Sequence, residues 1–182
     1  MIIKGISLWE PWASLIATGA KKFETRCWHT NYRGPLLICA SKVKVDYTSG
    51  QHLADYLFDG DFQGGLAPLV GLPLKFNPPR TFDAGVRPEH LRYGLATSLA
   101  ILTDCIPTEN LTVQQIGTDL PFGDFRRLRF AWKLDHVKRI PFDFPVKGKQ
   151  MLFDVYIDEV RIERFIEEYL ACWKEKGHYV HP

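Results

Sequence analysis

The sequence predicts an α+β domain in which several short strands form a curled sheet and one helix lies near each end of the chain. The apolar runs in the body of the chain are short and are bounded by glycine and proline, which is typical of strands. A short helix is predicted between Pro11 and Gly19, because proline suits the first helical position and glycine suits the end of a helix. Residues 157–176 carry apolar side chains at near-helical spacing among Glu and Arg, which predicts an amphipathic C-terminal helix packed on the body.

Residues 19–40 read as helix end, strand, turn and strand, and three further strands are predicted later in the chain. Residues 36–40 are apolar throughout and predict a fully buried strand, and residues 94–106 predict another, although their pattern is also compatible with a helix. Residues 130–140 alternate between apolar and polar side chains and change phase near His136, which predicts a half-buried strand with a bulge. Residues 151–155 predict a closing strand. Short strands flanked by an early and a late helix favour a sheet that curls into a small barrel.

The length of 182 residues corresponds to one domain with its own hydrophobic core, so residues 1–182 are predicted to form a single domain. Between residues 46 and 93, glycine and proline interrupt every apolar run, which predicts a loop-rich insertion with a short helix around residues 51–58. Loops of this length are usually functional lids or variable decoration, and the pattern is compatible with both.

Positive charge is concentrated in one stretch of the chain, although the formal net charge is only +2. Residues 126–149 carry eight basic side chains against two acidic ones, Asp135 and Asp143. This asymmetry predicts a positive face suited to an anionic partner such as a phosphate backbone, the alternative being a solvated surface that folding mixes with acidic side chains. The basic residues are Arg126, Arg127, Arg129, Lys133, Lys138, Arg139, Lys147 and Lys149.

The cysteine and histidine residues follow no metal-binding or disulfide pattern. The four cysteines and six histidines are scattered, without C-x-x-C or H-E-x-x-H spacing. We therefore predict reduced cysteines and no metal or other cofactor. No apolar run reaches membrane-spanning length, and the N-terminus lacks the features of a secretion signal, so a cytoplasmic protein without a membrane partner is expected.

Ionisable side chains are clustered directly after the predicted first helix. Lys21, Glu24 and Arg26 follow Gly19 within a short stretch of otherwise apolar, aromatic-rich sequence. If the chain is extended here, Glu24 and Arg26 point to the same face, because side chains alternate along a strand, and Lys21 lies in the turn near that face. The cluster predicts a functional site. Its structural alternative is a Glu24–Arg26 ion pair that only orders the edge of the sheet.

The cluster resembles the hallmark of the ASCH domain family, G-x-K-x-x-E-x-R, which is matched at Gly19, Lys21, Glu24 and Arg26. Two further stretches, around residues 7–13 and 130–150, also resemble the family. The resemblance implies a small PUA-like β-barrel related to YTH and EVE domains, with the hallmark residues in a cleft between the first helix and the barrel. It also implies a role in RNA binding or RNA metabolism, so the expected partner is RNA or a nucleoside or nucleotide ligand.

The residue types in this region fit recognition of RNA. Lysine and arginine donate hydrogen bonds to phosphate or base acceptors, and Glu24 can accept one from a base amino group or hold Arg26 in place. Tryptophan rings near the cluster can stack an unpaired base, although core packing is the favoured role for Trp9. The candidate ligand-binding residues are Trp12, Lys21, Glu24, Arg26, Trp28, Lys147 and Lys149.

Three alternatives to a binding module remain open. One is a hydrolase of modified nucleosides, because a bacterial relative with an ASCH-type domain deacetylates acetylated cytidine with a lysine that corresponds to Lys21, but carries a threonine where Glu24 stands here. Lys21 and Glu24 would then be catalytic, with Glu24 as a general base. The second is a metal-independent ribonuclease that uses Lys21, Glu24 and either Tyr32 or His29. The third is a protein-interaction role through the C-terminal helix.

Overall fold

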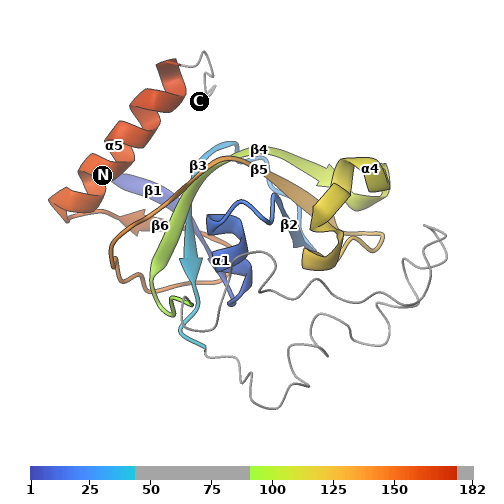
Figure 1. Ribbon diagram of the computed structural model, residues 1–182, viewed down its shortest axis with the longest axis horizontal. Helices are drawn as coiled ribbons and strands as arrows, with labels where there is room; N and C mark the ends of the chain where they lie inside the picture. Colours follow the sequence, from blue (N-terminus) through green and yellow to red (C-terminus); the bar gives the residue numbers. More distant parts are fainter. Residues whose placement is uncertain (44–90, 176–182) are drawn as a thin grey trace.

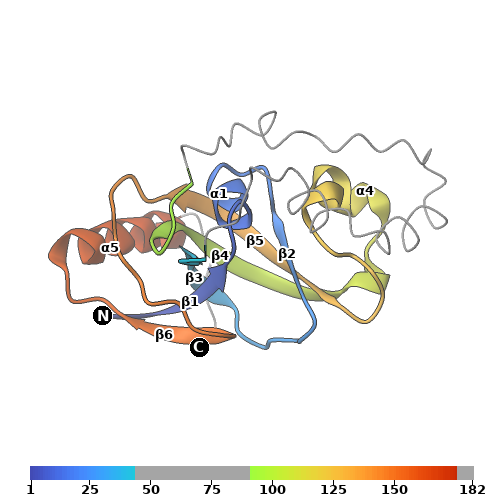
Figure 2. The same ribbon diagram turned by 90° about the horizontal axis from the view of Figure 1, so that it is seen from below.

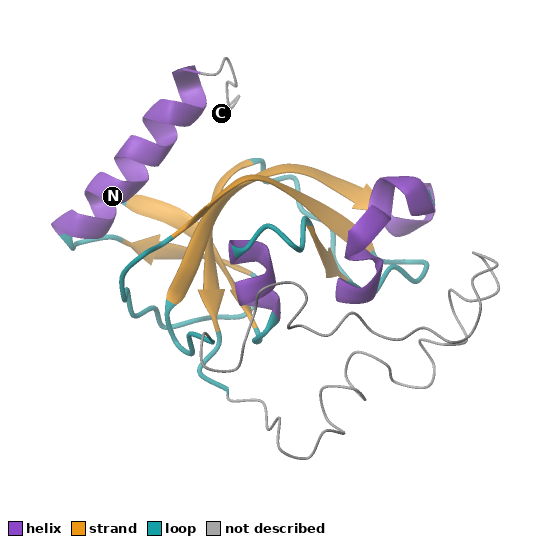
Figure 3. Ribbon diagram, in the orientation of Figure 1, coloured by secondary structure: helices purple, strands orange, loops and turns teal. Residues whose placement is uncertain are grey.

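The computed structural model describes residues 1–43 and 91–175. In this part of the chain a curled sheet arches over the short helix α1, and the long helix α5 lies at the opposite end of the molecule from α4 (Figure 1; Figure 3 shows the same view by secondary structure). The strands are β1 (Ile2–Leu8), β2 (Phe23–Arg26), β3 (Gly34–Ala40), β4 (Ala96–Pro107), β5 (Phe130–Arg139) and β6 (Leu152–Tyr156). The helices are α1 (Trp12–Ala17), α4 (Val113–Ile116) and α5 (Val160–Glu175), with 3-10 helices η2 (Thr108–Asn110) and η3 (Gly117–Phe122).

Within the described residues, the strands form one mixed sheet of six in the order β2-β5-β4-β3-β1-β6. The β1–β3 pair is parallel and the other pairs are antiparallel. The α+β class is therefore as predicted, but the expected barrel is not closed, because the edge strands β2 and β6 do not pair (Figures 1 and 2). Strand twist curls the sheet. Strand β2, however, has only four residues and makes no backbone ladder with β1. The two strands are joined by a side-chain hydrogen bond, in which Arg26 Nη2 donates to the carbonyl oxygen of Ser7 at 3.2 Å.

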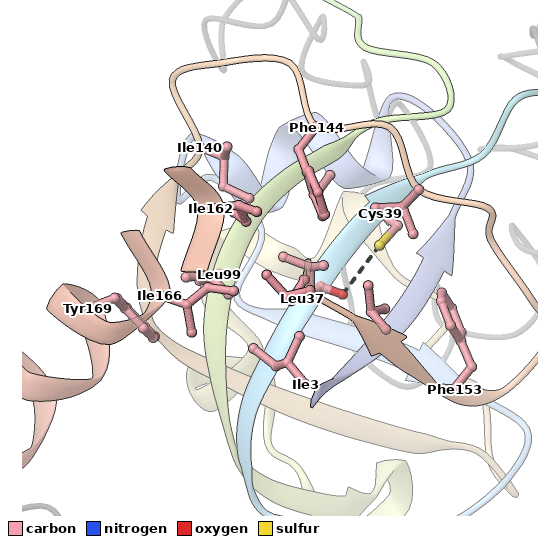
Figure 4. Packing of buried hydrophobic residues seen from close by; sticks show 14 of the residues in the cluster. Ile3, Leu37, Cys39, Leu99, Ile140, Phe144, Phe153, Ile162, Ile166 and Tyr169 are labelled. Atoms are coloured by element: carbon pink, nitrogen blue, oxygen red, sulfur yellow. Dashed lines mark hydrogen bonds between the residues drawn. The ribbon is translucent and has the colours of Figure 1, made fainter. Parts of the chain in front are cut away.

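The central strand β3 separates two hydrophobic cores. Leu37 and Cys39 face the core covered by α5, whereas Leu36 and Ile38 face the core that contains α1. Because successive side chains of a strand point to opposite faces, a strand that is buried on both faces is apolar throughout. This is why the continuous apolar run at residues 36–40 predicts the strand correctly. Figure 4 shows side chains of the first core, with those of α5 packed against β3 and β4.

Helix α1 is anchored at its start by a buried carboxylate. Glu10 is 1% exposed and accepts hydrogen bonds from the Ser14 backbone N–H at 3.0 Å and from Ser14 Oγ at 2.8 Å. The helix ends as the sequence predicts, because Gly19 takes a φ of 79°, a left-handed conformation that glycine adopts without strain. The chain then turns directly into β2.

Helix α5 covers the outer face of the sheet with one side only. Ile162, Ile166, Tyr169 and Trp173 are buried, whereas Val160 is 77% exposed. The predicted amphipathic helix is thus present over Val160–Glu175, and it packs on the body of the domain as expected. Its apolar face is buried in the core of the chain itself.

Two predictions about strands have clear outcomes. Residues 94–106, which were compatible with either a strand or a helix, form most of strand β4. The predicted bulge in β5 is confirmed at His136, which has a φ of 53° and lies where the register with β4 shifts. Strand β1 is missing from the sequence prediction because Gly5 interrupts its pattern. A Cβ at Gly5 would come within 2.8 Å of Val155 on the neighbouring β6, so only glycine fits there.

The 108–122 region also differs from the prediction, which assigned no helix to it. Here Thr112 and Gln115 form a capping box at the start of α4, and η3 follows directly. The predicted insertion at 46–93 and its helix at 51–58 lie outside the described residues, apart from 91–93. No helix in the described segments is both long and apolar enough to cross a membrane.

Candidate functional site

A cleft of about 920 Å³ opens beside β2 and the start of α1. In the described part of the chain it is bounded by five segments: the end of β1 with the start of α1, the β2 region, the residue after β3, the end of η3 with the chain that follows it, and the loop before β6. Five cationic side chains and two carboxylates line it, so positive charge is in excess. The lining residues are Ser7, Leu8, Trp9, Trp12, Lys21, Glu24, Thr25, Arg26, Trp28, Ser41, Phe122, Gly123, Asp124, Arg126, Arg129, Gly148, Lys149, Gln150 and Met151.

Lys21 lies at the base of the cleft and is only 1% exposed. Its Nζ donates hydrogen bonds at 2.6 Å to the carbonyl oxygens of both Phe23 and Phe122, and lies 3.5 Å from Glu24 Oε2. An ammonium group has three N–H donors, and these three acceptors match that number. Lys21 thus ties β2 to the end of η3, and its donors are turned toward the protein.

Glu24 and Arg26 project from the same face of β2, as the two-residue period predicts. Arg26 Nε lies 3.0 Å from Glu24 Oε1, but its N–H forms no hydrogen bond of good geometry, so this contact is an ion pair rather than a directed bond. The Glu24 carboxylate therefore lies between two cations, Lys21 and Arg26. It is 7% exposed, and the Arg26 side chain is 27% exposed toward the cleft.

Asp119 fixes η3 against the start of β2. Its Oδ2 accepts hydrogen bonds from the backbone N–H groups of Lys22 at 2.6 Å and Phe23 at 2.7 Å. Burial raises the pKa of Asp119 above its ordinary value, and this effect outweighs the two hydrogen bonds and the charges of Lys21 and Lys22, which lower it. Asp119 does not line the cleft, so it positions one wall without facing a ligand.

Asp124 forms ion pairs with two arginines on the cleft wall that follows η3. Arg126 donates to both of its oxygens at 2.9 Å, and Arg129 Nε lies 3.1 Å from Oδ2. Burial alone would raise the pKa of Asp124, but the hydrogen bonds from Arg126 and the charges of both arginines together lower it. The Asp124 backbone N–H also donates to Thr25 Oγ1 at 2.9 Å, which joins this wall to β2.

Aromatic rings form the apolar part of the cleft. The Trp28 ring is half-buried and packs edge-to-face on the fully buried Trp132, with ring centroids 4.5 Å apart. Trp12, the first residue of α1, is also half-buried and packs against the core that contains α1. Trp9 is 41% exposed. Sequence reasoning favoured Trp9 for the core, but the structure places it at the cleft instead. Exposed or half-buried tryptophan faces are suited to stacking on a planar ligand.

The structure brings most of the sequence-predicted site residues together. Trp12, Lys21, Glu24, Arg26, Trp28 and Lys149 all line the cleft, whereas Lys147 is exposed and does not. Tyr32 and His29, the candidate acid–base groups of a ribonuclease, are also not among the lining residues. The Tyr32 hydroxyl donates to the carbonyl oxygen of Pro35, and burial raises its pKa to about 12. The His29 ring packs against Phe130.

The family model for the ASCH domain matches residues 6–175. The chain belongs to the ASCH domain family. The match extends over nearly the whole chain, in agreement with the hallmark at Gly19, Lys21, Glu24 and Arg26. No curated protein matches the chain.

Several residues of this ASCH domain that shape the cleft were missed by sequence reasoning. Arg126 and Arg129 were included only as part of a basic stretch, and the excess of charge was the available signal. Asp119 and Asp124 carried no signal, because their partners Lys22, Phe23 and Thr25 lie 96 to 99 residues away in sequence. Gly123 was also missed: a Cβ there would come within 2.7 Å of Phe125 and 3.1 Å of Thr25.

Proposed function

We propose that this ASCH domain binds single-stranded RNA, or a nucleotide derivative, in the cleft. The observation that carries the proposal is the combination of excess positive charge with tryptophan rings in one cleft. Membership of the ASCH family points to nucleic-acid binding in general, and single strands are commonly held by a cationic groove in which unstacked bases meet aromatic faces.

Two parts of the cleft would have separate tasks. Arg126, Arg129 and Lys149 suit phosphate groups, because Lys149 is exposed and the two arginines share the carboxylate of Asp124, so positive charge exceeds negative charge along this wall. Trp12 and Trp28 suit a base, because each presents a partly exposed ring in the same cleft as the Glu24–Arg26 pair.

The contacts of Lys21 favour binding over turnover. A lysine that acts as a nucleophile or base needs a free amine, whereas the Lys21 Nζ is buried and directed at two carbonyl oxygens and a carboxylate. We therefore expect no cytidine to be released when the protein is incubated with acetylated cytidine. Release that is lost in the Lys21→Met variant would contradict the binding-only proposal and favour the amidohydrolase alternative.

The proposal is tested by the salt dependence of RNA binding. The double variant Arg126→Ala/Lys149→Ala removes two cations from the cleft, and the control Arg164→Ala/Lys174→Ala removes two exposed cations from α5, outside the cleft. In fluorescence anisotropy with a labelled single-stranded RNA, the slope of log affinity against log salt should decrease in magnitude by about 1.4 for the cleft variant, because each phosphate contact on a single strand contributes about 0.7.

The control variant should keep the wild-type slope. Equal slopes for the two variants would contradict binding in the cleft, and an affinity that does not respond to salt would contradict phosphate recognition altogether.

A further inference from the structure

Two exposed apolar side chains, Leu128 and Met151, lie at the rim of the cleft and are called the rim pair below. Met151 lines the cleft and is 60% exposed, and Leu128 is 83% exposed in the turn between the cleft-lining Arg126 and Arg129. Neither side chain belongs to a hydrophobic cluster of the described residues. Packing within the chain therefore does not account for the rim pair.

The backbone at both positions adopts a conformation that favours other residue types. Among the non-glycine residues that the structure describes, three have a positive φ: Leu128 at 65°, Met151 at 59° and His136 at 53°. The bulge in β5 accounts for His136. For a bulky side chain this left-handed conformation is an outlier, whereas glycine and asparagine adopt it readily. Leucine and methionine thus lower the stability of the folded chain at these two positions, and they make no core contact that offsets this loss.

Cationic side chains flank both members of the rim pair. Arg127 and Arg129 adjoin Leu128 in sequence, and Lys149 lies two residues before Met151 on the loop that leads into β6. A single nucleic-acid strand matches this arrangement, because its anionic phosphate groups alternate with bases that present flat, weakly polar faces. Leucine and methionine are also among the side chains that nucleic-acid-binding proteins insert between neighbouring bases.

Resting on the proposed function, we propose that Leu128 and Met151 are base-contacting residues at the rim of the cleft. Each side chain packs against the face of an unpaired base of the bound strand, while the adjoining arginines and Lys149 hold phosphate groups. The binding surface then extends beyond the lining of the cleft to the turn at residues 127–128. Because the contact of the rim pair is apolar, its contribution to affinity does not depend on the release of counterions.

The inference is tested with the variant Leu128→Asn/Met151→Asn, which removes both apolar side chains without a change in net charge. Its affinity for a labelled single-stranded RNA, measured by anisotropy, should be about tenfold lower than that of wild type, as expected for the loss of two partly buried apolar side chains. The slope of log affinity against log salt should keep the wild-type value, because no phosphate contact is lost. The control Ile2→Asn/Val160→Asn replaces two exposed apolar side chains outside the cleft and should keep the wild-type affinity.

An abasic oligomer of equal length separates base contact from other effects, because it keeps the sugar–phosphate backbone and lacks the bases. Wild type and the rim variant should bind this oligomer with affinities within about twofold of each other. The midpoint of thermal unfolding of the rim variant should equal or exceed that of wild type, because asparagine tolerates a positive φ better than leucine or methionine does. A lower affinity for RNA then does not reflect a loss of folded protein.

Four results would overturn the inference and leave the proposed function intact: unchanged RNA affinity in the rim variant, the same loss in the control, an equal loss on the abasic oligomer, or a changed salt slope. A clearly lower unfolding midpoint would show that the two side chains stabilise the protein itself, which also overturns the inference. If wild type does not bind RNA, or binds it without salt dependence, the proposed function itself fails and the inference fails with it.

Discussion

Individual residues at the cleft are held by contacts that admit few substitutes. Gly148 is an example, because a Cβ at this position would clash with Ser7 Oγ and lie 3.1 Å from Ser7 Cβ. Gly19 is different, since the space around it is open and only its φ of 79° disfavours other residues. The two glycines therefore serve different purposes, close approach of two segments in one case and backbone conformation in the other.

This difference predicts the result of a rescue experiment. Gly148→Ala should lower the free energy of unfolding by about 1–3 kcal/mol, as overpacking does, and should weaken RNA binding by displacing the loop that carries Lys149. Adding Ser7→Gly should restore most of the stability, because it removes both clashing atoms. Urea unfolding measures the effect. No recovery in the double variant would contradict the assigned close approach.

Asp124, which lines the cleft, and Asp119, which holds η3 against β2, should respond to pH in opposite ways. The pKa of Asp119 is raised, so its contribution to stability is present below the ordinary value of 3.8 and is lost as pH rises through the folded-state pKa. The pKa of Asp124 is lowered, so its contribution is present above 3.8 and is lost as pH falls through the folded-state pKa.

Urea unfolding of wild type, Asp119→Asn and Asp124→Asn across the acidic to neutral range tests this pair. In Asp119→Asn the amide oxygen of the new side chain can still accept the two backbone hydrogen bonds, so this variant should gain stability relative to wild type as pH rises. Asp124→Asn should lose stability relative to wild type over the same change. Parallel pH dependence of the two variants would show that one of the assigned pKa directions is wrong.

At the level of elements, α5 stabilises the domain through one face and leaves the other to solvent. Ile166→Ala should lower the free energy of unfolding by about 2–5 kcal/mol, because the side chain is fully buried against the sheet. Val160→Ala on the same helix is the control and should change it by less than about 0.5 kcal/mol, since Val160 is 77% exposed. Similar losses in both variants would contradict the packing of α5 shown in Figure 4.

At the level of the whole molecule, the two cores share strands β3 and β4. Leu99 and Ile101 face the α5 core, whereas Ala100 and Leu102 face the α1 core, so neither core can be lost while the other keeps its sheet. We therefore expect a single cooperative unfolding transition. Far-UV circular dichroism and tryptophan fluorescence, which reports on Trp173 in one core and Trp132 in the other, should give coincident curves. Separate transitions would indicate that the cores are independent.

Local pattern predicted those parts of the fold in which neighbouring residues decide the structure. The doubly buried strand at residues 36–40, the helix end at Gly19, the bulge at His136 and the shared face of Glu24 and Arg26 follow from side-chain periodicity and glycine chemistry. Strand β1 was missed because Gly5 interrupts the alternation of side chains along it. The need for glycine at this position comes from the close approach of β6, where Val155 leaves no room for a Cβ. The hallmark also located the candidate site within the chain, at the residues that line the base of the cleft.

The sequence by itself determined the α+β class, the family and the position of the charged cluster, because these depend on composition and on spacing within a few residues. Only the tertiary structure decided that the sheet stays open and that Lys21 is buried among carbonyl oxygens. It also decided that Asp124, Arg126 and Arg129 form a wall of the cleft. The physical reason is that hydrogen bonds and ion pairs between residues about one hundred positions apart leave no periodic signal in the sequence, although they determine which donors and acceptors face the cleft.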